Sequence, residues 1–225
     1  MRVHVAFTPA EDIDAPVGIV VDVVRATSSI AQALASGYER VLCCGEIEQA
    51  RALRAELGDE AVVGGERRAV MIPGFDLGAS PRDFLEPRAP TLILSTTNGT
   101  QAILSAAARC ETVVLGSLLN LGAVVRAAAG RDTAILCSGF QGAFALDDAY
   151  CAGRIVERLD AERTDAAIAA ALIAAAYPDA HAGLDARTYG PPGLEADIEY
   201  CAQVDLLDVV PRFSRMVGDA AEIVA

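Results

Sequence analysis

Short, continuous aliphatic runs that alternate with helix-like stretches constrain the fold of this chain more than any other feature. Continuous runs predict strands buried on both faces, as in parallel sheets. Strands are expected at Val17–Val24, Val41–Cys44, Ala61–Gly64, Thr91–Ser95, Thr112–Leu115 and Thr133–Ser138. Helices are expected between them at Thr27–Ser36, Glu46–Leu57, Thr100–Ala108, Leu119–Ala129 and Leu146–Leu159. The alternation indicates βαβ units and a mostly parallel sheet.

The rest of the chain extends this pattern. Asp160–Ala176 predicts an outer helix, Pro178–Gly193 a loop, and Glu195–Val210 a helix that stops near Pro211. We therefore expect an α/β fold in which mostly parallel β-sheet layers are flanked by helices, in three α/β/α layers of two similar βαβ subdomains. Residues 1–225 are expected to form a single domain, with an internal repeat whose halves lie near 1–88 and 89–225.

The repeat is suggested by two similar segments that begin at Val20 and Ile93. Superposing V-V-D-V-V-R-A-T on I-L-S-T-T-N-G-T aligns Arg25 with Asn98, and Thr27 with Thr100. Chance resemblance between two strand–helix units is the alternative. A true repeat would bring the two strand-end loops near one another, where open parallel sheets bind their ligands.

The net charge of −13 and the absence of lysine exclude several function classes. A nucleic-acid partner is not expected, because neutralising phosphates requires clustered basic residues. Schiff-base chemistry and a Walker-type loop both need a lysine. The six cysteines form no C-x-x-C pair, so we expect reduced thiols. The longest apolar run, 12 residues at 166–177, is too short to span a bilayer, so we expect a cytoplasmic protein with no membrane partner.

Asp22 is the first candidate functional residue, because it interrupts a strand expected to be buried. A carboxylate in such a run is costly unless it is paired or binds a metal. A pair with Arg25 and a cap from Thr27 would explain the pattern structurally. In the functional alternative, Asp22 holds a divalent cation, Arg25 binds an anion, and Thr27 and Ser28 supply donors at a helix N-terminus.

A second candidate anion site is Thr96–Thr100, between another strand and a helix. Gly99 permits close approach of the backbone, and Asn98 and Thr100 carry polar groups at the helix start. A plain turn without a binding role is the alternative interpretation of this segment.

Further polar residues follow the other strands. Glu66 comes after two glycines, Asp76 and Ser80 belong to a loop, and Glu46 begins a helix. Ser117 and Asn120 stand at the matching loop of the second half, and Asp147 and Asp148 follow a glycine-rich stretch. Helix capping and solvated turns are the structural explanations for these residues.

Three common phosphatase chemistries are excluded by the sequence. No arginine lies six residues after any cysteine, and neither histidine belongs to an R-H-G motif. The haloacid-dehalogenase type needs a D-x-D motif and a later lysine, which are also missing around Asp22.

Seven motifs in order resemble the 2-phosphosulfolactate phosphatase family. They are V-D-V-V-R-A-T-S (21–28), G-E-I-E-Q-A (45–50), G-E-R (65–67), G-F-D-L-G-A-S-P (74–81), T-T-N-G-T (96–100), G-S-L-L-N (116–120) and L-D-D-A-Y-C-A-G (146–153). The resemblance implies Mg²⁺-dependent hydrolysis of 2-phosphosulfolactate to 3-sulfolactate and phosphate, a step towards coenzyme M. The chain departs from the family pattern at Ala79, Asp147 and Arg68, where Asn, Glu and Gly are expected.

The resulting hypothesis assigns a role to each candidate. The catalytic residues are Asp22, Arg25 and Glu66, and the metal ligands are Asp22, Glu66 and Asp147 or Asp148. The substrate-binding residues are Thr27, Ser28, Glu46, Asp76, Ser80, Asn98, Gly99, Thr100, Ser117 and Asn120. The expected partner is a small anionic phosphorylated substrate, and a homo-oligomer is compatible with the sequence. Hydrolysis of another phosphorylated acid and non-catalytic anion binding are the alternative functions.

Overall fold

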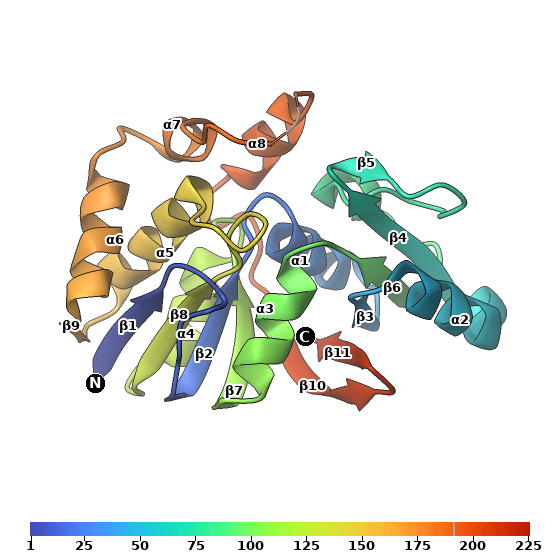
Figure 1. Ribbon diagram of the computed structural model, residues 1–225, viewed down its shortest axis with the longest axis horizontal. Helices are drawn as coiled ribbons and strands as arrows, with labels where there is room; N and C mark the ends of the chain where they lie inside the picture. The colour runs from blue at the N-terminus through green and yellow to red at the C-terminus, as the bar shows by residue number, and fades with distance from the viewer. Residues whose placement is uncertain (191) are drawn as a thin grey trace.

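Eleven strands form one sheet in the part of the chain that the computed structural model describes, residues 1–190 and 192–225 (Figure 1). The strands are β1 (Arg2–Ala6), β2 (Ala15–Val21), β3 (Arg40–Cys44), β4 (Ala61–Arg67), β5 (Val70–Met71), β6 (Thr91–Ser95), β7 (Cys110–Gly116), β8 (Thr133–Cys137), β9 (Glu162–Arg163), β10 (Arg212–Val217) and β11 (Ala220–Val224). The helices are α1 (Ala26–Ser36), α2 (Ile47–Leu57), α3 (Gly99–Ala107), α4 (Leu121–Ala128), α5 (Leu146–Arg158), α6 (Asp165–Ala175), α7 (Ala180–Asp185) and α8 (Glu195–Cys201), with short 3-10 turns at Gly58–Glu60 and Pro81–Phe84. A strand is present at each of the six predicted places, and the expected α/β class is confirmed.

The strand order is β5-β4-β6-β3-β11-β10-β7-β2-β8-β1-β9. Two parallel blocks, β4-β6-β3 and β7-β2-β8-β1, are joined by the antiparallel hairpin β10–β11. The hairpin joins β3 by three residue pairs and β7 by the single pair Arg212–Val114. Figure 1 shows this C-terminal hairpin between the two blocks. The chain end therefore completes the sheet at its centre.

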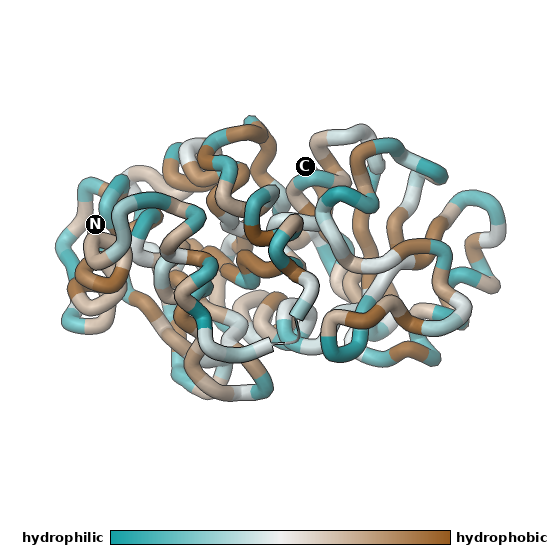
Figure 2. The backbone as a smooth tube through the Cα atoms, turned by 90° about the horizontal axis from the view of Figure 1, so that it is seen from above, coloured by the Kyte–Doolittle hydropathy of each residue, from teal (hydrophilic) through white to brown (hydrophobic). Residues whose placement is uncertain are grey.

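Helices cover both faces of the sheet. On one face, Ile30 of α1 and Ile103 of α3 pack in a cluster that spans both strand blocks. On the other face, α4, α5 and α6 pack over the block that contains β2, and α2 packs over the block that contains β6. Hydrophobic stretches of chain run through the interior of both blocks, and hydrophilic stretches lie mainly in outer turns (Figure 2). Burial of these aliphatic faces is the main stabilising term of the fold.

Two connections cross the hairpin in opposite directions. The chain passes from β2 through α1 to β3, and later from β6 through α3 to β7. The C-terminal ends of β2 and β6 are therefore the starting points of the two crossings. Ligands of open α/β sheets bind outside such points, where the direction of connection reverses.

Strand β2 ends earlier than predicted. The expectation of Val17–Val24 is wrong at its C-terminal end, because β2 stops at Val21. The backbone oxygen of Asp22 accepts a hydrogen bond from the N–H of Thr27 at 2.9 Å. Asp22 is thus the first residue of the turn into α1 and no longer part of the sheet, and the Val24–Arg25 peptide bond in this turn is cis.

The C-terminal third differs most from the prediction. The expected loop 178–193 contains α7, whose first turn is capped by Asp179 accepting from the N–H of Ala182 at 2.8 Å; residue 191 lies outside the described residues. The expected helix 195–210 ends at Cys201, because the N–H groups of Asp205 and Leu207 bond to the chain before α4. Helix α6 begins later than expected, at Asp165, where Thr164 caps it by accepting from the N–H of Ala167.

Helix α6 is built almost entirely from apolar residues and packs on α5 and β1 as an outer layer, as expected. Among the described residues, no helix combines the length and the apolar character needed to cross a membrane.

Candidate active site

The first turns of α1 and α3 meet at the C-terminal ends of β2 and β6. A Cβ atom at Gly99 would lie 2.6 Å from the Cβ of Ala26 and 2.9 Å from Oδ2 of Asp22, so only glycine fits there. Both helix N-termini therefore approach Asp22. Unpaired backbone N–H groups and the helix dipole give such ends a partial positive charge that favours anions. The structure brings together the two strand-end loops that the sequence aligned.

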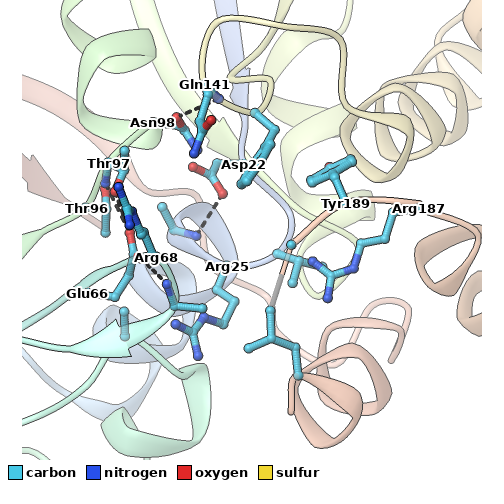
Figure 3. Close-up of a pocket in the computed structure, with 17 residues that line it drawn as sticks. Asp22, Arg25, Glu66, Arg68, Thr96, Thr97, Asn98, Gln141, Arg187 and Tyr189 are labelled. Atoms are coloured by element: carbon cyan, nitrogen blue, oxygen red, sulfur yellow. Dashed lines mark hydrogen bonds between the residues drawn. The ribbon is translucent and has the colours of Figure 1, made fainter. Parts of the chain in front are cut away.

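A cavity opens beside this junction (Figure 3). Its wall is formed by segments from both strand blocks and by the connection between α7 and α8. The lining residues are Asp22, Val24, Arg25, Ala26, Glu66, Arg68, Ala69, Ala79, Thr96, Thr97, Asn98, Phe140, Gln141, Arg187, Tyr189, Gly190 and Leu194. Asp22, Arg25, Glu66 and Asn98, all sequence-predicted, thus share one cavity.

Asp22 lies at the centre of the site. Its Oδ1 accepts a hydrogen bond from the N–H of Ala26 at 3.2 Å. Its Oδ2 accepts none from the described residues. Burial raises the pKa of Asp22 to about 7, with the charges of Asp147 and Glu66 adding to the effect, while the Ala26 N–H and Arg25 oppose it. Negative charge is therefore crowded around this carboxyl group.

Asp147 and Asp148 begin helix α5 and are almost fully buried. Asp148 accepts from the N–H of Val23 at 2.9 Å and from the N–H of Gly139 at 3.0 Å, so both of its oxygens are occupied. Burial raises the pKa of Asp148 well above its ordinary value, and the charges of Asp147 and Asp22 raise it further. Asp148 thus ties the chain after β2 to the chain after β8.

Asp147 has a different set of partners. Its Oδ1 accepts from the hydroxyl of Tyr189 and from the N–H of Asp148, and its Oδ2 accepts no hydrogen bond from the described part of the chain. Burial raises the pKa of Asp147, against the Tyr189 hydrogen bond and the charge of Arg187, which lower it.

The donor set fits a Mg²⁺ ion that is shared with a bound ligand. Within residues 1–190 and 192–225, no three His, Cys, Asp or Glu side chains are gathered as a complete metal site. Mg²⁺ usually needs only one or two carboxylates, because water and substrate phosphate oxygens supply its other ligands. Asp22 and Asp147 each have one carboxylate oxygen without a donor, and a cation would offset their mutual repulsion.

Glu66 connects β4 to the β6–α3 turn. Its Oε1 accepts from the N–H of Thr97 at 3.2 Å and from the Thr97 hydroxyl at 3.0 Å. Its Oε2 accepts from the N–H of Ala69 at 2.6 Å. Both oxygens are occupied by the protein, so Glu66 in this conformation shapes the cavity wall.

Arg25 is held by an ion pair that the sequence analysis did not foresee. Its Nη1 lies 2.6 Å from Oδ2 of Asp197 in α8, and both side chains are about nine-tenths buried. The other oxygen of Asp197 accepts from the hydroxyl of Ser80 at 2.5 Å. Ser80, predicted to bind substrate, lies behind Arg25 in this chain of contacts.

The hydroxyl groups predicted as substrate donors are bonded to the backbone. Thr27 donates to the carbonyl of Asp22 at 2.9 Å, Ser28 to Val23 at 2.7 Å and Thr100 to Cys44 at 3.3 Å. All three hydroxyl residues are buried and lie outside the cavity lining. Their geometry fixes the strand-to-helix turns.

The predicted residues Ser80, Gly99, Asp147 and Asp148, described above, are not part of the lining either, and neither are the four that follow. Ser117 donates to Asn120 at 2.9 Å, and Asn120 donates in turn to the carbonyls of Leu115 and Val209. Asp76 accepts from the N–H of Val63 at 2.9 Å, and Glu46 is an exposed residue that precedes α2. The structure does not bring these side chains to Asp22.

Sequence reasoning missed the side of the cavity formed by the α7–α8 connection. Tyr189 stacks on Phe140 with ring centroids 4.5 Å apart, and Arg187 lies 6.0 Å from the Tyr189 ring. Gln141 donates its backbone N–H to Asn98 Oδ1 at 3.3 Å. Phe140, an aromatic residue between Gly139 and Gly142, was the available signal in the sequence. Arg187 and Tyr189 gave no signal, because their segment has the composition of an ordinary loop.

Comparisons with known proteins point to one family. The profile of the family described as 2-phosphosulpholactate phosphatase matches residues 4–215. A probable 2-phosphosulfolactate phosphatase of Thermus thermophilus is 38% identical, with 98% of each chain covered. Proteins of the same description from Clostridium novyi and Caldanaerobacter subterraneus are 35% and 36% identical; the first match covers 87% of this chain and 88% of the relative, the second 86% of each.

Proposed function

The chain belongs to the 2-phosphosulpholactate phosphatase family, a family of phosphoric monoester hydrolases, and we propose that it is a Mg²⁺-dependent enzyme that hydrolyses 2-phosphosulfolactate to 3-sulfolactate and phosphate. The product would serve a coenzyme M type of pathway. The observation that carries the proposal is the junction of two helix N-termini at Asp22, whose Oδ2 is without a donor in the described chain.

The residues around the junction have separate tasks in this proposal. The backbone N–H groups that begin α3, together with Arg25, bind the phosphate group and stabilise the charge that develops on its oxygens during transfer. The first two N–H groups of α1 donate to Asp22, so α1 contributes the partial positive charge of its dipole. Asp197 and Ser80 hold Arg25 in position from behind. Asp148 fixes the loop that carries Asp22.

A magnesium ion would be held by Asp22 and Asp147. When bound, Mg²⁺ neutralises phosphate charge and activates or orients the attacking water. The protein's own part is to hold the two carboxyl groups in a sheltered site. A bound cation would favour their ionised form there, against the burial that raises the pKa of both. Tyr189 orients Asp147 through its hydroxyl, and its ring with that of Phe140 limits access of bulk water.

The test is release of inorganic phosphate from 2-phosphosulfolactate with Mg²⁺, after EDTA, and after Mg²⁺ is restored. We expect EDTA to abolish turnover reversibly. Asp22→Asn should lower kcat by about 10³-fold or more, because it removes a metal ligand and the charge at the centre of the site. Asp219→Asn, in the exposed β10–β11 turn, removes the same charge elsewhere and serves as the control.

Full turnover in EDTA would refute the metal requirement, and an active Asp22→Asn variant would refute the role of Asp22. A panel of phosphorylated acids tests the substrate in the same assay. Turnover of another phosphorylated acid in preference to 2-phosphosulfolactate would support the second candidate function, hydrolysis of a different small phospho-acid. The small Ala79 in the cavity wall, where the family pattern leads us to expect Asn, is the observation that favours that alternative.

The third function, non-catalytic anion binding, predicts a different outcome. No phosphorylated acid would then be hydrolysed, and Asp22→Asn would leave binding of phosphate intact. Calorimetric titration with inorganic phosphate measures this directly.

A further inference from the structure

Three arginines line the cavity, and they differ in their partners. Arg25 is paired with Asp197 at 2.6 Å. Arg187 lies against Tyr189, and its charge acts on Asp147. Arg68, in the turn between β4 and β5, has no ion pair and no side-chain hydrogen bond to the described residues. Arg187 also has neither within the described chain, but its guanidinium lies over the Tyr189 ring. Arg68 is therefore the cavity arginine that has no ion-pair, hydrogen-bond or ring partner among the described residues, and its guanidinium is available to a ligand.

The backbone at Arg68 is unusual for a large side chain. Arg67 pairs with Val70 across the β4–β5 hairpin, so Arg68 and Ala69 form a two-residue turn with φ values of 55° and 60°. Such turns favour glycine and asparagine, because other residues are disfavoured in the left-handed region. The neighbouring Arg67 has a structural task, since it donates to the carbonyls of Glu66 and Gly45. Arg68 has no such structural task. Its backbone conformation is unfavourable, yet it brings an unpaired charge to the cavity, and this combination points to a functional role.

The position of Arg68 suits a second anionic group of a ligand. Figure 3 shows Arg68 beside Glu66 on one side of Asp22, with Arg187 and Tyr189 on the other. The helix N-termini and Arg25 already provide the phosphate site at the centre. An arginine fork binds a carboxylate or sulfonate through two parallel hydrogen bonds, and this interaction is stronger than a neutral hydrogen bond.

We propose that Arg68 is a specificity-determining residue that binds the second anionic group of the substrate, a carboxylate or sulfonate, at the rim of the cavity. The proposal rests on the proposed function, because it takes the phosphate group to lie at the α1–α3 junction. Phosphate esters with a second acid group are then favoured over esters without one.

The kinetic test compares two substrates, 2-phosphosulfolactate and glycerol 2-phosphate, which has no second acid group. Arg68→Gly should lower kcat/KM for 2-phosphosulfolactate by about 10- to 100-fold, as loss of a charge-assisted hydrogen bond does. It should leave kcat/KM for glycerol 2-phosphate unchanged, and Arg68→Lys should retain part of the preference. Glycine suits the left-handed turn, so the variant should fold, and thermal unfolding checks this. Arg88→Ala removes an exposed arginine outside the cavity lining and is the charge-matched control.

Equal losses with both substrates would overturn the proposal, because Arg68 would then bind the phosphate group. Unchanged kinetics with both would also overturn it.

A binding measurement separates this proposal from the proposed function. Arg68→Gly should weaken binding of 3-sulfolactate by about 10-fold or more, and it should leave binding of inorganic phosphate unchanged. Calorimetric titration gives both values without turnover. If the unaltered protein hydrolyses no phosphate ester, the proposed function fails, and this titration still reports on Arg68. If the unaltered protein is active but Arg68→Gly binds 3-sulfolactate as tightly, the role of Arg68 alone is refuted.

Discussion

Replacing Asp197 by alanine isolates the contact that joins α8 to the catalytic cavity. The substitution leaves the Arg25 guanidinium, whose side chain is 10% exposed, without its partner at 2.6 Å, and it also frees the Ser80 hydroxyl. Removing one partner of a buried ion pair costs about 3–5 kcal/mol. Because Arg25 also faces the cavity and reaches water there, we expect a loss of about 2–3 kcal/mol in the free energy of unfolding.

Urea unfolding followed by circular dichroism measures this loss, which corresponds to a fall in Tm of roughly 5–10 °C for a chain of this size. The matched control is a double-mutant cycle with Arg25→Ala. Removing both charges should cost less than the sum of the two single substitutions, because the uncompensated buried charge disappears. A change within about 0.5 kcal/mol for Asp197→Ala, or strict additivity in the cycle, would refute the reasoning.

Two further predictions concern packing and charge elsewhere. Gly99→Ala should lower the free energy of unfolding by about 1–3 kcal/mol and reduce activity at least about 10-fold, because the added Cβ would displace Asp22 and Ala26. Normal activity would show that the α1–α3 junction can accept a Cβ without loss of function. Glu222, in the central strand β11, has a pKa lowered by its hydrogen bond from Arg215 and by a second one from Arg40. Its stabilising contribution is therefore present above its ordinary pKa of 4.5 and is lost as pH falls through the lowered value. The unfolding midpoint of Glu222→Gln should accordingly be lower than that of the parent at pH 7, and the two should converge in acid.

The parallel core was predictable because its strands are continuous aliphatic runs. The C-terminal hairpin was not predictable from the sequence. Apolar and polar residues alternate little in β10, and β11 contains the buried Glu222. That carboxylate is tolerated in a central strand because Arg40 and Arg215 bond to it at 3.1 and 2.8 Å. Such long-range compensation leaves no local pattern in the sequence.

The centre of the site was predictable for a related reason. Asp22, Arg25 and Asn98 follow buried strands directly, and strand ends in a parallel sheet meet at one edge. Arg187 and Tyr189, which line the cavity, and Asp197, which pairs with Arg25, were not found. They are placed only by the packing of α7 and α8 on α5 and η2, the 3-10 turn Pro81–Phe84. Their position depends on tertiary contacts that no local motif encodes.

The hydrogen bonds of the acidic residues separate two kinds of carboxylate that look alike in the sequence. Asp148 and Glu66 have both oxygens occupied by protein donors, so they hold loops in position. Asp22 and Asp147 each keep one oxygen without a donor in the described chain, although burial makes an unpaired charge costly. The fold would gain stability by pairing those oxygens. Asp22 lies beside two helix N-termini, which favour an anion, so these open oxygens support the proposal that their partner is a cation that arrives with an anionic substrate.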